Sequence, residues 1–308
     1  MMKLQEIIFI TGPTAIGKSE TAVLLAKKID AEIISCDSMQ IYKGMDILVS
    51  KPGTELLKGV THHLISMISP VKEYNVSAYR RQALKEIKRI TGKNKVTLFV
   101  GGTGLYMSIL VDGIFQIKSE NKDIRNKLYQ QAEKKGSIYL HKRLAKVDPQ
   151  AAAKIHPNDT RRIVRALEVF LVTGKPISEL QKTRKGLIDE YKVKIFCLDM
   201  PREQLYQRID ARVEKMFRQG LVDEVRRLLK RKLSRTARFA IGIRELEGFF
   251  NGAYDLAEAK RLIQRNSRQY AKRQLTWFRK DKRIEWINID EKDKPDKISD
   301  RILKILKN

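Results

Sequence analysis

The segment at residues 7–19, IIFITGPTAIGKS, constrains the fold of this chain more than any other segment. It opens with a β-branched apolar run, Ile7 to Thr11, which predicts a buried strand. A helix with an apolar face follows, and the residues between match the phosphate-loop pattern G-x-x-x-x-G-K-[ST]. These residues are Gly12, Pro13, Thr14, Ala15, Ile16, Gly17, Lys18 and Ser19. The strand, loop and helix together predict a binding site for a nucleotide or another diphosphate.

The spacing of this loop has a physical cause. Gly12 and Gly17 allow the backbone to curl so that successive N–H groups point inward at an anion. The helix that begins at about Ser19 adds its positive end. Lys18 can neutralise phosphate oxygens, and the Ser19 hydroxyl can bind a Mg²⁺ ion that bridges them. The loop alone does not distinguish ATP from other diphosphates, and it does not identify the reaction.

Composition narrows the class of partner. The 308 residues are 42% hydrophobic, enough for one large domain or for a core with a smaller second domain. The net charge of +27 favours nucleic acid as the partner, ahead of an acidic membrane surface or a generally lysine-rich proteome. No apolar run approaches the ~20 residues of a membrane span, and no secretory signal is apparent. Two cysteines, Cys36 and Cys197, suit a reducing cytosol, so we expect a cytoplasmic protein.

Two further strands carry polar residues to the edge of the expected sheet. The strand at 32–36 leads to Asp37, and ligands bind at this edge in open α/β sheets. Asp37 is therefore a candidate metal ligand or general base, although a helix N-cap is an equal alternative. The strand at 96–100 ends in a second glycine turn, Gly101 to Gly104, where a hydrolytic NTPase would have an aspartate. That difference argues against an ATPase motor.

The order of predicted elements indicates an α/β fold, a P-loop NTPase-like parallel sheet flanked by helices with an inserted all-helical subdomain. We expect the catalytic core at 1–115 and 191–308, and the insertion at 116–190. Within the insertion, helices are predicted over 121–134, 137–147, 149–155 and 159–173, and Gly174 ends the last one. Residues 43–73 are predicted to be irregular. Their adjacent His62 and His63 should point in different directions, which argues against a two-ligand metal site and favours one packed or loop-bracing histidine. No structure is predicted for 281–308.

The helix predicted over about 255–279 has two unlike faces. At about 100° per residue, one face carries five basic residues without an acid among them. They are Arg261, Arg265, Arg268, Lys272 and Arg279. The opposite face, expected to be buried, carries Leu256, Ala259, Ile263, Tyr270 and Trp277. A basic stripe of this kind can follow a nucleic-acid backbone, whereas a merely solvated face normally mixes charges of both signs.

Several motifs together resemble the bacterial tRNA dimethylallyltransferases, also called tRNA isopentenyltransferases. They are the phosphate loop, Asp37 to Asp46, His62-His63-Leu64, Gly101 to Tyr106, His156 to Val169, Ile241-Gly242 and Lys272 to Arg279. The resemblance implies transfer of a dimethylallyl group from its diphosphate to N6 of adenosine 37 in tRNA. It also implies Mg²⁺ at Ser19, Asp37 as general base, Thr103 as a second catalytic residue, and a monomeric protein.

The resemblance further implies that the anticodon stem-loop contacts both the core and the insertion. The residues expected to bind tRNA are Asp37, Ser38, Met39, Gln40, Thr103, Arg125, Arg161, Arg162, Ile163, Val164, Arg165, Gly242, Arg244, Lys272, Arg273, Gln274, Thr276, Trp277 and Arg279. A small-molecule or nucleoside kinase shares the phosphate loop but would consume ATP without RNA. A nucleic-acid-stimulated NTPase would release phosphate.

Overall fold

The computed structural model describes residues 5–115 and 121–307 and divides into two compact units. One unit combines residues 1–111 with 190–308, and the other is 112–189. The sequence placed these divisions after residues 115 and 190. None of the helices in the described residues is long and apolar enough to cross a membrane.

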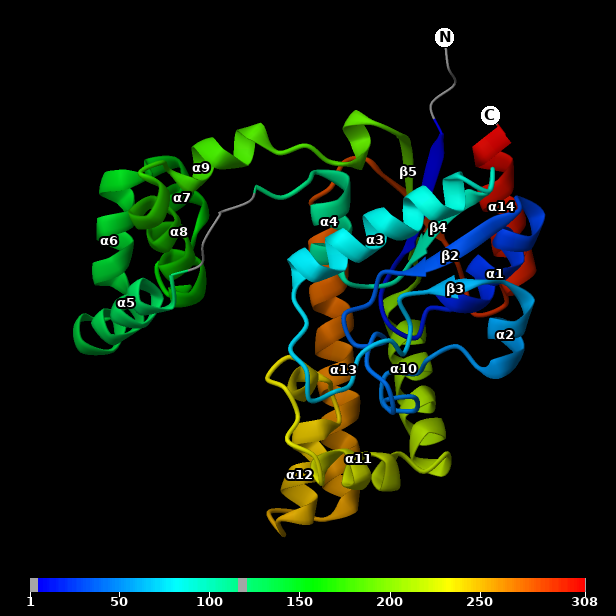
Figure 1. Ribbon diagram of the computed structural model, residues 1–308. Helices are drawn as coiled ribbons and strands as arrows, with labels where there is room; N and C mark the ends of the chain where they lie inside the picture. Colours follow the sequence, from blue (N-terminus) through cyan, green and yellow to red (C-terminus); the bar gives the residue numbers. More distant parts are fainter. Residues whose placement is uncertain (1–4, 116–120, 308) are drawn as a thin grey trace. The chain divides into compact units, whose positions relative to one another are not determined.

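The larger unit is built on a six-stranded sheet in the order β3-β2-β4-β1-β5-β6 (Figure 1). Every neighbouring pair is parallel. The strands are β1 (Glu6–Thr11), β2 (Ala31–Ser35), β3 (His62–His63), β4 (Val96–Val100), β5 (Lys192–Asp199) and β6 (Ile284–Asn288). The central strands are continuous apolar runs because helices cover them. The predicted α/β fold is confirmed.

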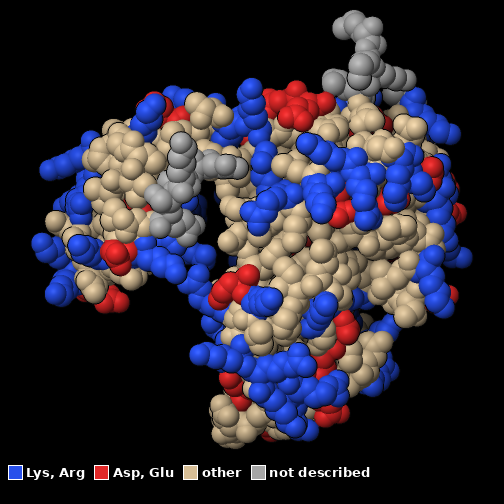
Figure 2. Space-filling model, viewed as in Figure 1, with Lys and Arg blue, Asp and Glu red and all other residues tan. Residues whose placement is uncertain are grey.

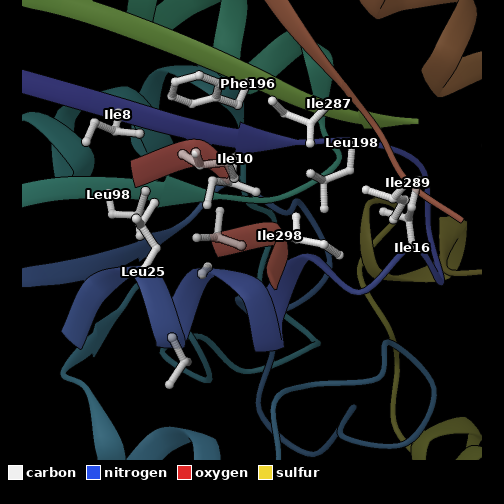
Figure 3. Packing of buried hydrophobic residues seen from close by; sticks show 14 of the residues in the cluster. Ile8, Ile10, Ile16, Leu25, Leu98, Phe196, Leu198, Ile287, Ile289 and Ile298 are labelled. Atoms are coloured by element: carbon white, nitrogen blue, oxygen red, sulfur yellow. The ribbon is translucent and has the colours of Figure 1, made fainter. Parts of the chain in front are cut away.

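The hydrophobic core joins the sheet to two helices from opposite ends of the chain. These are α1 (Lys18–Lys28) and α14 (Pro295–Lys307). Figure 3 shows Leu25 of α1 and Ile298 of α14 beside strand residues such as Ile10 and Leu198. Because β1 and α1 are both anchored in this cluster, the loop that connects them is held at its two ends.

Four more helices extend beyond the carboxyl ends of the strands (Figure 1). They are α10 (Arg202–Arg218), α11 (Leu221–Leu229), α12 (Ile243–Phe250) and α13 (Leu256–Phe278). One face of α10 is a buried apolar stripe that consists of Leu205, Ile209, Val213 and Met216. Elsewhere α3 (Val76–Thr91) and α4 (Gly104–Val111) pack against each other, and Asn75 caps the start of α3 by accepting from the Ala78 N–H.

The insertion unit is helical throughout its named elements. Its helices are α5 (Lys122–Lys135), α6 (Ser137–Val147), α7 (Pro149–Lys154), α8 (Thr160–Thr173) and α9 (Ile177–Leu180). The four helices predicted here are confirmed, with ends that shift by at most one residue. Gly174 ends α8 in the left-handed conformation, φ 70°. The unit has its own core, which includes Leu128, Leu140, Leu144, Ile163 and Leu167.

Two segments differ from the sequence-based prediction. The tail, for which no structure was predicted, supplies the edge strand β6 and the helix α14. The segment at 43–73, expected to be irregular, contains α2 (Thr54–Gly59) and the short strand β3. The expectation of one packed histidine in the pair His62 and His63 agrees with the structure. His63 is buried, and its Nε2 lies 2.7 Å from Glu32 Oε2.

The buried face of α13 is also different from the predicted one. Ala259 and Ile263 are buried as expected, but Leu256 is 37% and Trp277 45% exposed. Ala271, Gln274 and Phe278 are buried in their place. The prediction treated α13 as a helix with one partner, whereas it contacts α4, α10 and α12, so its buried surface is broader and rotated. Aromatic side chains on such a helix need not face inward.

Candidate active site

The phosphate loop connects the end of β1 to the start of α1. At Gly12 φ is 141°, and a Cβ there would lie 2.9 Å from the Leu198 carbonyl oxygen on β5, so no side chain fits. Gly17, at φ 93°, is the last residue before α1. Lys18 then reaches back across the loop, where its Nζ donates to the Pro13 carbonyl at 2.7 Å. The loop thus surrounds an anion site with backbone N–H groups, a helix N-terminus and one ammonium group.

A second cation, Arg212 of α10, lies against the same loop. Its Nη1 donates to Thr14 Oγ1 at 2.6 Å, and its Nε donates to Ser50 Oγ at 2.8 Å. Burial lowers the pKa of Arg212. Sequence reasoning missed this residue, although a signal was present: Arg212 interrupts the apolar stripe of α10 between Ile209 and Val213. An arginine in that position must find a polar partner inside the protein.

The electrostatics of Lys18 connect the loop to Asp37. Burial lowers the pKa of Lys18 to about 8; the carboxylate of Asp37 opposes this shift and the charge of Arg212 adds to it. Lys18, Arg212 and Asp37 therefore act on one another electrostatically. A diphosphate bound in the loop would restore the full charge of Lys18, because an adjacent anion favours the ammonium form.

The second glycine turn holds the segment that carries Asp37. A Cβ on Gly101 would lie 2.1 Å from the Cys36 carbonyl oxygen, so the two backbones touch only because this residue is glycine. The Thr103 N–H donates to the same carbonyl at 3.2 Å, and the Ser38 N–H donates to Thr103 Oγ1 at 3.0 Å. Asp37 itself accepts from the Met39 N–H at 2.9 Å, within its own turn and not at a helix. The N-cap alternative for Asp37 is therefore wrong.

Gln274 of α13 joins the two glycine turns. Its Oε1 accepts from the Thr14 N–H at 3.0 Å, and its Nε2 donates to the Gly102 carbonyl at 2.9 Å. The side chain is buried. The sequence pointed to Gln274 as a tRNA-binding residue, but its observed contacts hold the phosphate loop against the turn that contains Thr103.

These elements border one cavity of about 1500 Å³. Its polar lining includes Lys18, Asp37 and Arg212, and its apolar lining includes Ile33, Leu56, Ile65, Val100 and Met216. A ligand with an anionic head and a short hydrocarbon tail matches this mixture. Tyr270 of α13 also lines the cavity, next to Thr103 and near Asp37, and burial raises the pKa of its hydroxyl. The sequence-based prediction treated Tyr270 only as a core residue.

The donors around Ser19 are suited to Mg²⁺ held together with a substrate. Among the described residues no three histidine, cysteine or acidic side chains gather in a way that would hold a metal by themselves. Mg²⁺ does not need such a cage, since it is commonly bound by one or two protein oxygens and the phosphates of the substrate. Ser19 and Glu20 in the first turn of α1, together with Asp37, line the cavity and supply oxygen donors of this kind.

Comparison with known proteins agrees with this geometry. A model of the IPP transferase family matches residues 40–281. The tRNA dimethylallyltransferase of Carboxydothermus hydrogenoformans is 46% identical over 97% of this chain and 96% of its own. The tRNA dimethylallyltransferase of Geobacter sulfurreducens is 45% identical over 92% of this chain and 91% of its own length.

The chain belongs to the IPP transferase family. The sequence-based assignment to the tRNA dimethylallyltransferases is thereby confirmed. The crystal structure of the tRNA isopentenylpyrophosphate transferase from Bacillus halodurans is similar to this fold, with a TM-score of 0.72 and 37% identity, over 99% of this chain and 97% of that one. A eukaryotic dimethylallyltransferase whose structure is described as acting on tRNA gives a TM-score of 0.84 at 28% identity, covering 98% of this chain and 79% of that one.

Fewer than half of the residues that the family resemblance assigns to tRNA in the core unit are exposed, and Gly242 and Gln274 are buried. Ser38, Met39 and Gln40 follow Asp37, and Gln40 Oε1 accepts from Ser35 Oγ at 3.0 Å. Gly242, at φ 111°, precedes α12, and Arg244 lies exposed in its first turn. The exposed side chains near the end of α13 and just after it are Lys272, Arg273, Thr276, Trp277 and Arg279.

In the insertion unit the same assignment includes buried residues. Arg161 and Arg162 are exposed at the start of α8. Arg125 and Arg165 both bind Glu168, with nitrogen–oxygen distances of 3.0 Å. Ile163 and Val164 lie in the core of the unit. The side chains of Ile163 and Val164 therefore stabilise the helix that carries the arginines. Of the assigned arginines in this unit, Arg161 and Arg162 are exposed, and Arg162 Nε lies 2.5 Å from Asp159 Oδ2.

The basic stripe predicted on α13 is partly neutralised, which corrects the expectation of a face free of acids. Arg268 Nη1 lies 2.6 Å from Asp210 Oδ1 of α10, and Arg261 Nε lies 2.6 Å from Glu258 Oε2 on its own helix. Arg279 Nη2 lies 3.7 Å from Asp199 Oδ2. The arithmetic of helix faces could not show Asp210, because that residue comes from a neighbouring helix.

Proposed function

We propose that this chain transfers the dimethylallyl group of dimethylallyl diphosphate to N6 of adenosine 37 in tRNA. One observation carries the proposal: a phosphate loop and a carboxylate, Asp37, line the same cavity, which also has apolar walls. The loop suits a diphosphate leaving group, the apolar residues suit a five-carbon chain, and the carboxylate suits a proton acceptor. Family relatives similar over nearly their whole length are named for this reaction.

The leaving-group side of the reaction uses the phosphate loop. When the C1–O bond of dimethylallyl diphosphate breaks, the electron pair leaves with the diphosphate oxygen. The loop N–H groups, Lys18 and Arg212 are positioned to stabilise that added charge. Mg²⁺ bound at Ser19 and the phosphates would supply additional positive charge to the departing diphosphate.

The nucleophile side uses Asp37. Adenine N6 is a poor nucleophile, because its lone pair is delocalised into the ring. As the N6–C1 bond forms, Asp37 accepts the N6 proton as general base. Thr103, which holds the Ser38 N–H at 3.0 Å, keeps the segment bearing Asp37 in place. The target adenosine must leave its base stack to reach this cavity.

The tRNA is bound mainly through its phosphates, as is usual for RNA recognised by shape. Candidates for these contacts are the exposed basic residues of the core unit at Arg244, Lys272 and Arg273, and Arg161 and Arg162 of the insertion unit. We propose that the protein acts as a monomer in the cytoplasm.

The decisive experiment is incubation with undermodified tRNA and radiolabelled dimethylallyl diphosphate, in parallel with labelled ATP. Label should move from dimethylallyl diphosphate to RNA and should not move from ATP. Asp37→Asn should lower turnover by about 10²-fold or more. Asp30→Asn, which changes a carboxylate 77% exposed and paired with Lys95, should leave turnover unchanged. Phosphate transfer from ATP without RNA would instead identify a kinase.

A further inference from the structure

Phe239 stands out among the exposed apolar side chains. It is 53% exposed, more than any other aromatic side chain in residues 5–115 and 121–307. It ends a single 3-10 turn, Ala237–Phe239, whose first residue is fully buried. The backbone of the turn is thus anchored in the core while the phenyl ring extends into solvent. An isolated exposed ring needs no explanation, but the surroundings of this one are unusual.

A cation lies over the ring, and more cations precede it. The guanidinium of Arg244, exposed in the first turn of α12, lies 5.7 Å from the centre of the Phe239 ring. The segment between α11 and α12 also contains four exposed basic residues, Lys230, Arg231, Lys232 and Arg235. Figure 2 shows lysine and arginine gathered over this part of the core unit, where α11 and α12 lie in Figure 1. A polyanion is the partner that this charge attracts.

The turn is also braced against the segment that carries Asp37. The hydroxyls of Thr236 and Tyr42 lie 2.6 Å apart, and Tyr42 is fully buried at the end of the Asp37–Tyr42 segment. Thr236 Oγ1 also donates to Glu73 Oε2 at 3.0 Å. The ring of Phe239 therefore has a defined place relative to the active site, and ordering it on binding costs little.

We propose that Phe239 and Arg244 form a stacking platform for an unpaired nucleobase of the RNA substrate, outside the cavity that receives the modified adenine. The inference rests on the proposed function for the identity of the RNA. Every base has a π-face, so a phenyl ring can stack on it without reading its sequence. Arg244 can contact the neighbouring phosphate or the base itself. The platform would position the loop while the basic residues attract its backbone.

The test measures the affinity of a fluorescently labelled anticodon stem-loop for the full-length protein. Phe239→Ala should raise the Kd by about 5- to 100-fold, as expected when one base–aromatic stack is removed. Phe239→Leu, which keeps an apolar side chain without a ring, should also weaken binding, and Phe239→Tyr should restore it. The slope of log Kd against log salt should stay unchanged in Phe239→Ala, since every basic residue that binds phosphate is still present.

A matched control is present in the same unit. Arg226 lies 5.0 Å from the ring centre of Phe250, and this phenylalanine is half-buried, unlike the exposed Phe239. Phe250→Ala should leave the RNA affinity unchanged, and equal weakening by both alanine variants would overturn the assignment to Phe239. Thermal melting should show Phe239→Ala folded like the wild type, because its ring packs little against the core.

A spectroscopic measurement detects stacking directly. Stem-loops with 2-aminopurine at single loop positions should show quenching at one position, and this quenching should disappear in Phe239→Ala and in Phe239→Leu. Wild-type affinity and quenching in Phe239→Ala would overturn the platform and leave the proposed reaction untouched. Absence of dimethylallyl transfer by the wild type, with RNA binding that still depends on the ring at position 239, would overturn the reaction and support the platform.

Discussion

The Thr14 N–H and the Gln274 Oε1 lie 3.0 Å apart, although 260 positions separate them in the sequence. The same side chain donates through Nε2 to the Gly102 carbonyl at 2.9 Å. One buried amide therefore satisfies a donor on the phosphate loop and an acceptor on the second glycine turn. Gly102 has to be glycine here, because a Cβ would lie 2.1 Å from Gln274 Nε2. The relative position of the two substrate-binding turns depends on this side chain.

Gln274→Leu should consequently weaken both the fold and diphosphate binding. Each buried polar group left without its partner costs about 1–3 kcal/mol, so urea unfolding should show a decrease in stability of at least this size. The KM for dimethylallyl diphosphate should rise, because the loop is no longer held at Thr14. Gln269→Leu changes an exposed glutamine of the same helix and should alter stability by no more than about 0.5 kcal/mol. Equal stabilities for the two variants would contradict the bracing role.

The lowered pKa of Lys18 predicts how diphosphate binding depends on pH. Burial lowers this pKa to about 8 in the ligand-free protein. Below pH 8 the ammonium is charged before the ligand arrives. Above pH 8 a proton must be taken up on binding, so the Kd for dimethylallyl diphosphate should rise by up to about tenfold per pH unit. Calorimetric titration without RNA, at constant Mg²⁺, measures this dependence.

Lys18→Met is the control for that titration. It should bind dimethylallyl diphosphate more weakly at pH 7, with little change between pH 7 and 9.5, because the titrating group is gone. Lys18→Arg should keep its charge across this range and also lack the pH dependence. The same slope in Lys18→Met as in the wild type would assign the titration to another group.

A buried ionic cluster beside β2 predicts a second pH effect, on stability. Glu32 is buried, and its carboxylate accepts from Lys93 Nζ at 2.8 Å while lying 2.7 Å from His63 Nε2. Burial acts to raise the pKa of Glu32, but the hydrogen bonds to Lys93 and His63 outweigh it, and the pKa is lowered. A carboxyl with a lowered folded-state pKa contributes stability above its unfolded pKa, about 4.3, and this contribution disappears as pH falls further.

Glu32→Gln should therefore be less stable than the wild type at pH 7, with the difference shrinking as the pH falls below about 4.3. Urea unfolding at pH 7, 5 and 3.5 checks this. Glu55→Gln provides a control, because Glu55 is 88% exposed and should show no such difference. A gap between wild type and Glu32→Gln that stays constant from pH 7 to 3.5 would show that packing, and not charge, makes Glu32 important.

Sequence-based prediction succeeded where the local structure depends on one short segment of the chain. The run Ile7 to Ile10 is apolar because both faces of β1 are covered, and the loop pattern after it depends only on local backbone freedom and on Lys18. Gly174 ends α8 as predicted, because capping is a local interaction. The structure of the tail was not predicted, for the opposite reason. β6 is an edge strand whose buried residues Ile284 and Ile287 lie among polar and charged neighbours, and it is a strand because it pairs with β5.

Part of the candidate site was also predictable, because two of its residues are placed by the strands that precede them. Asp37 and Thr103 follow strands, and the edge of a parallel sheet brings strand ends together. Arg212 and Gln274 reach the site from α10 and α13, and no local pattern states which loop a helix will pack against. The charge of Arg268 likewise appeared free in the sequence until Asp210 of α10 was found beside it.

Arg268 and the pair Lys272 and Arg273 should respond differently to mutation, which tests the remaining basic surface of α13. Lys272 and Arg273 are exposed, so replacing both with alanine should weaken tRNA binding and leave stability nearly unchanged. For every phosphate that is no longer neutralised, the slope of log affinity against log salt should become shallower by about 0.7–0.9.

Arg268→Ala removes an ion pair of 2.6 Å to Asp210 and the placement of a guanidinium 5.9 Å from the centre of the Tyr206 ring. That variant should unfold at lower urea concentration and retain the wild-type salt slope, since its guanidinium already has a carboxylate partner. Fluorescence anisotropy between about 50 and 200 mM salt, with unfolding curves for each variant, separates the two effects. A reduced salt slope in Arg268→Ala would mean that RNA displaces Asp210 and that the whole stripe binds phosphate. A wild-type slope in the Lys272 and Arg273 double variant would place the phosphate contacts on other residues, such as Arg244 beside Phe239.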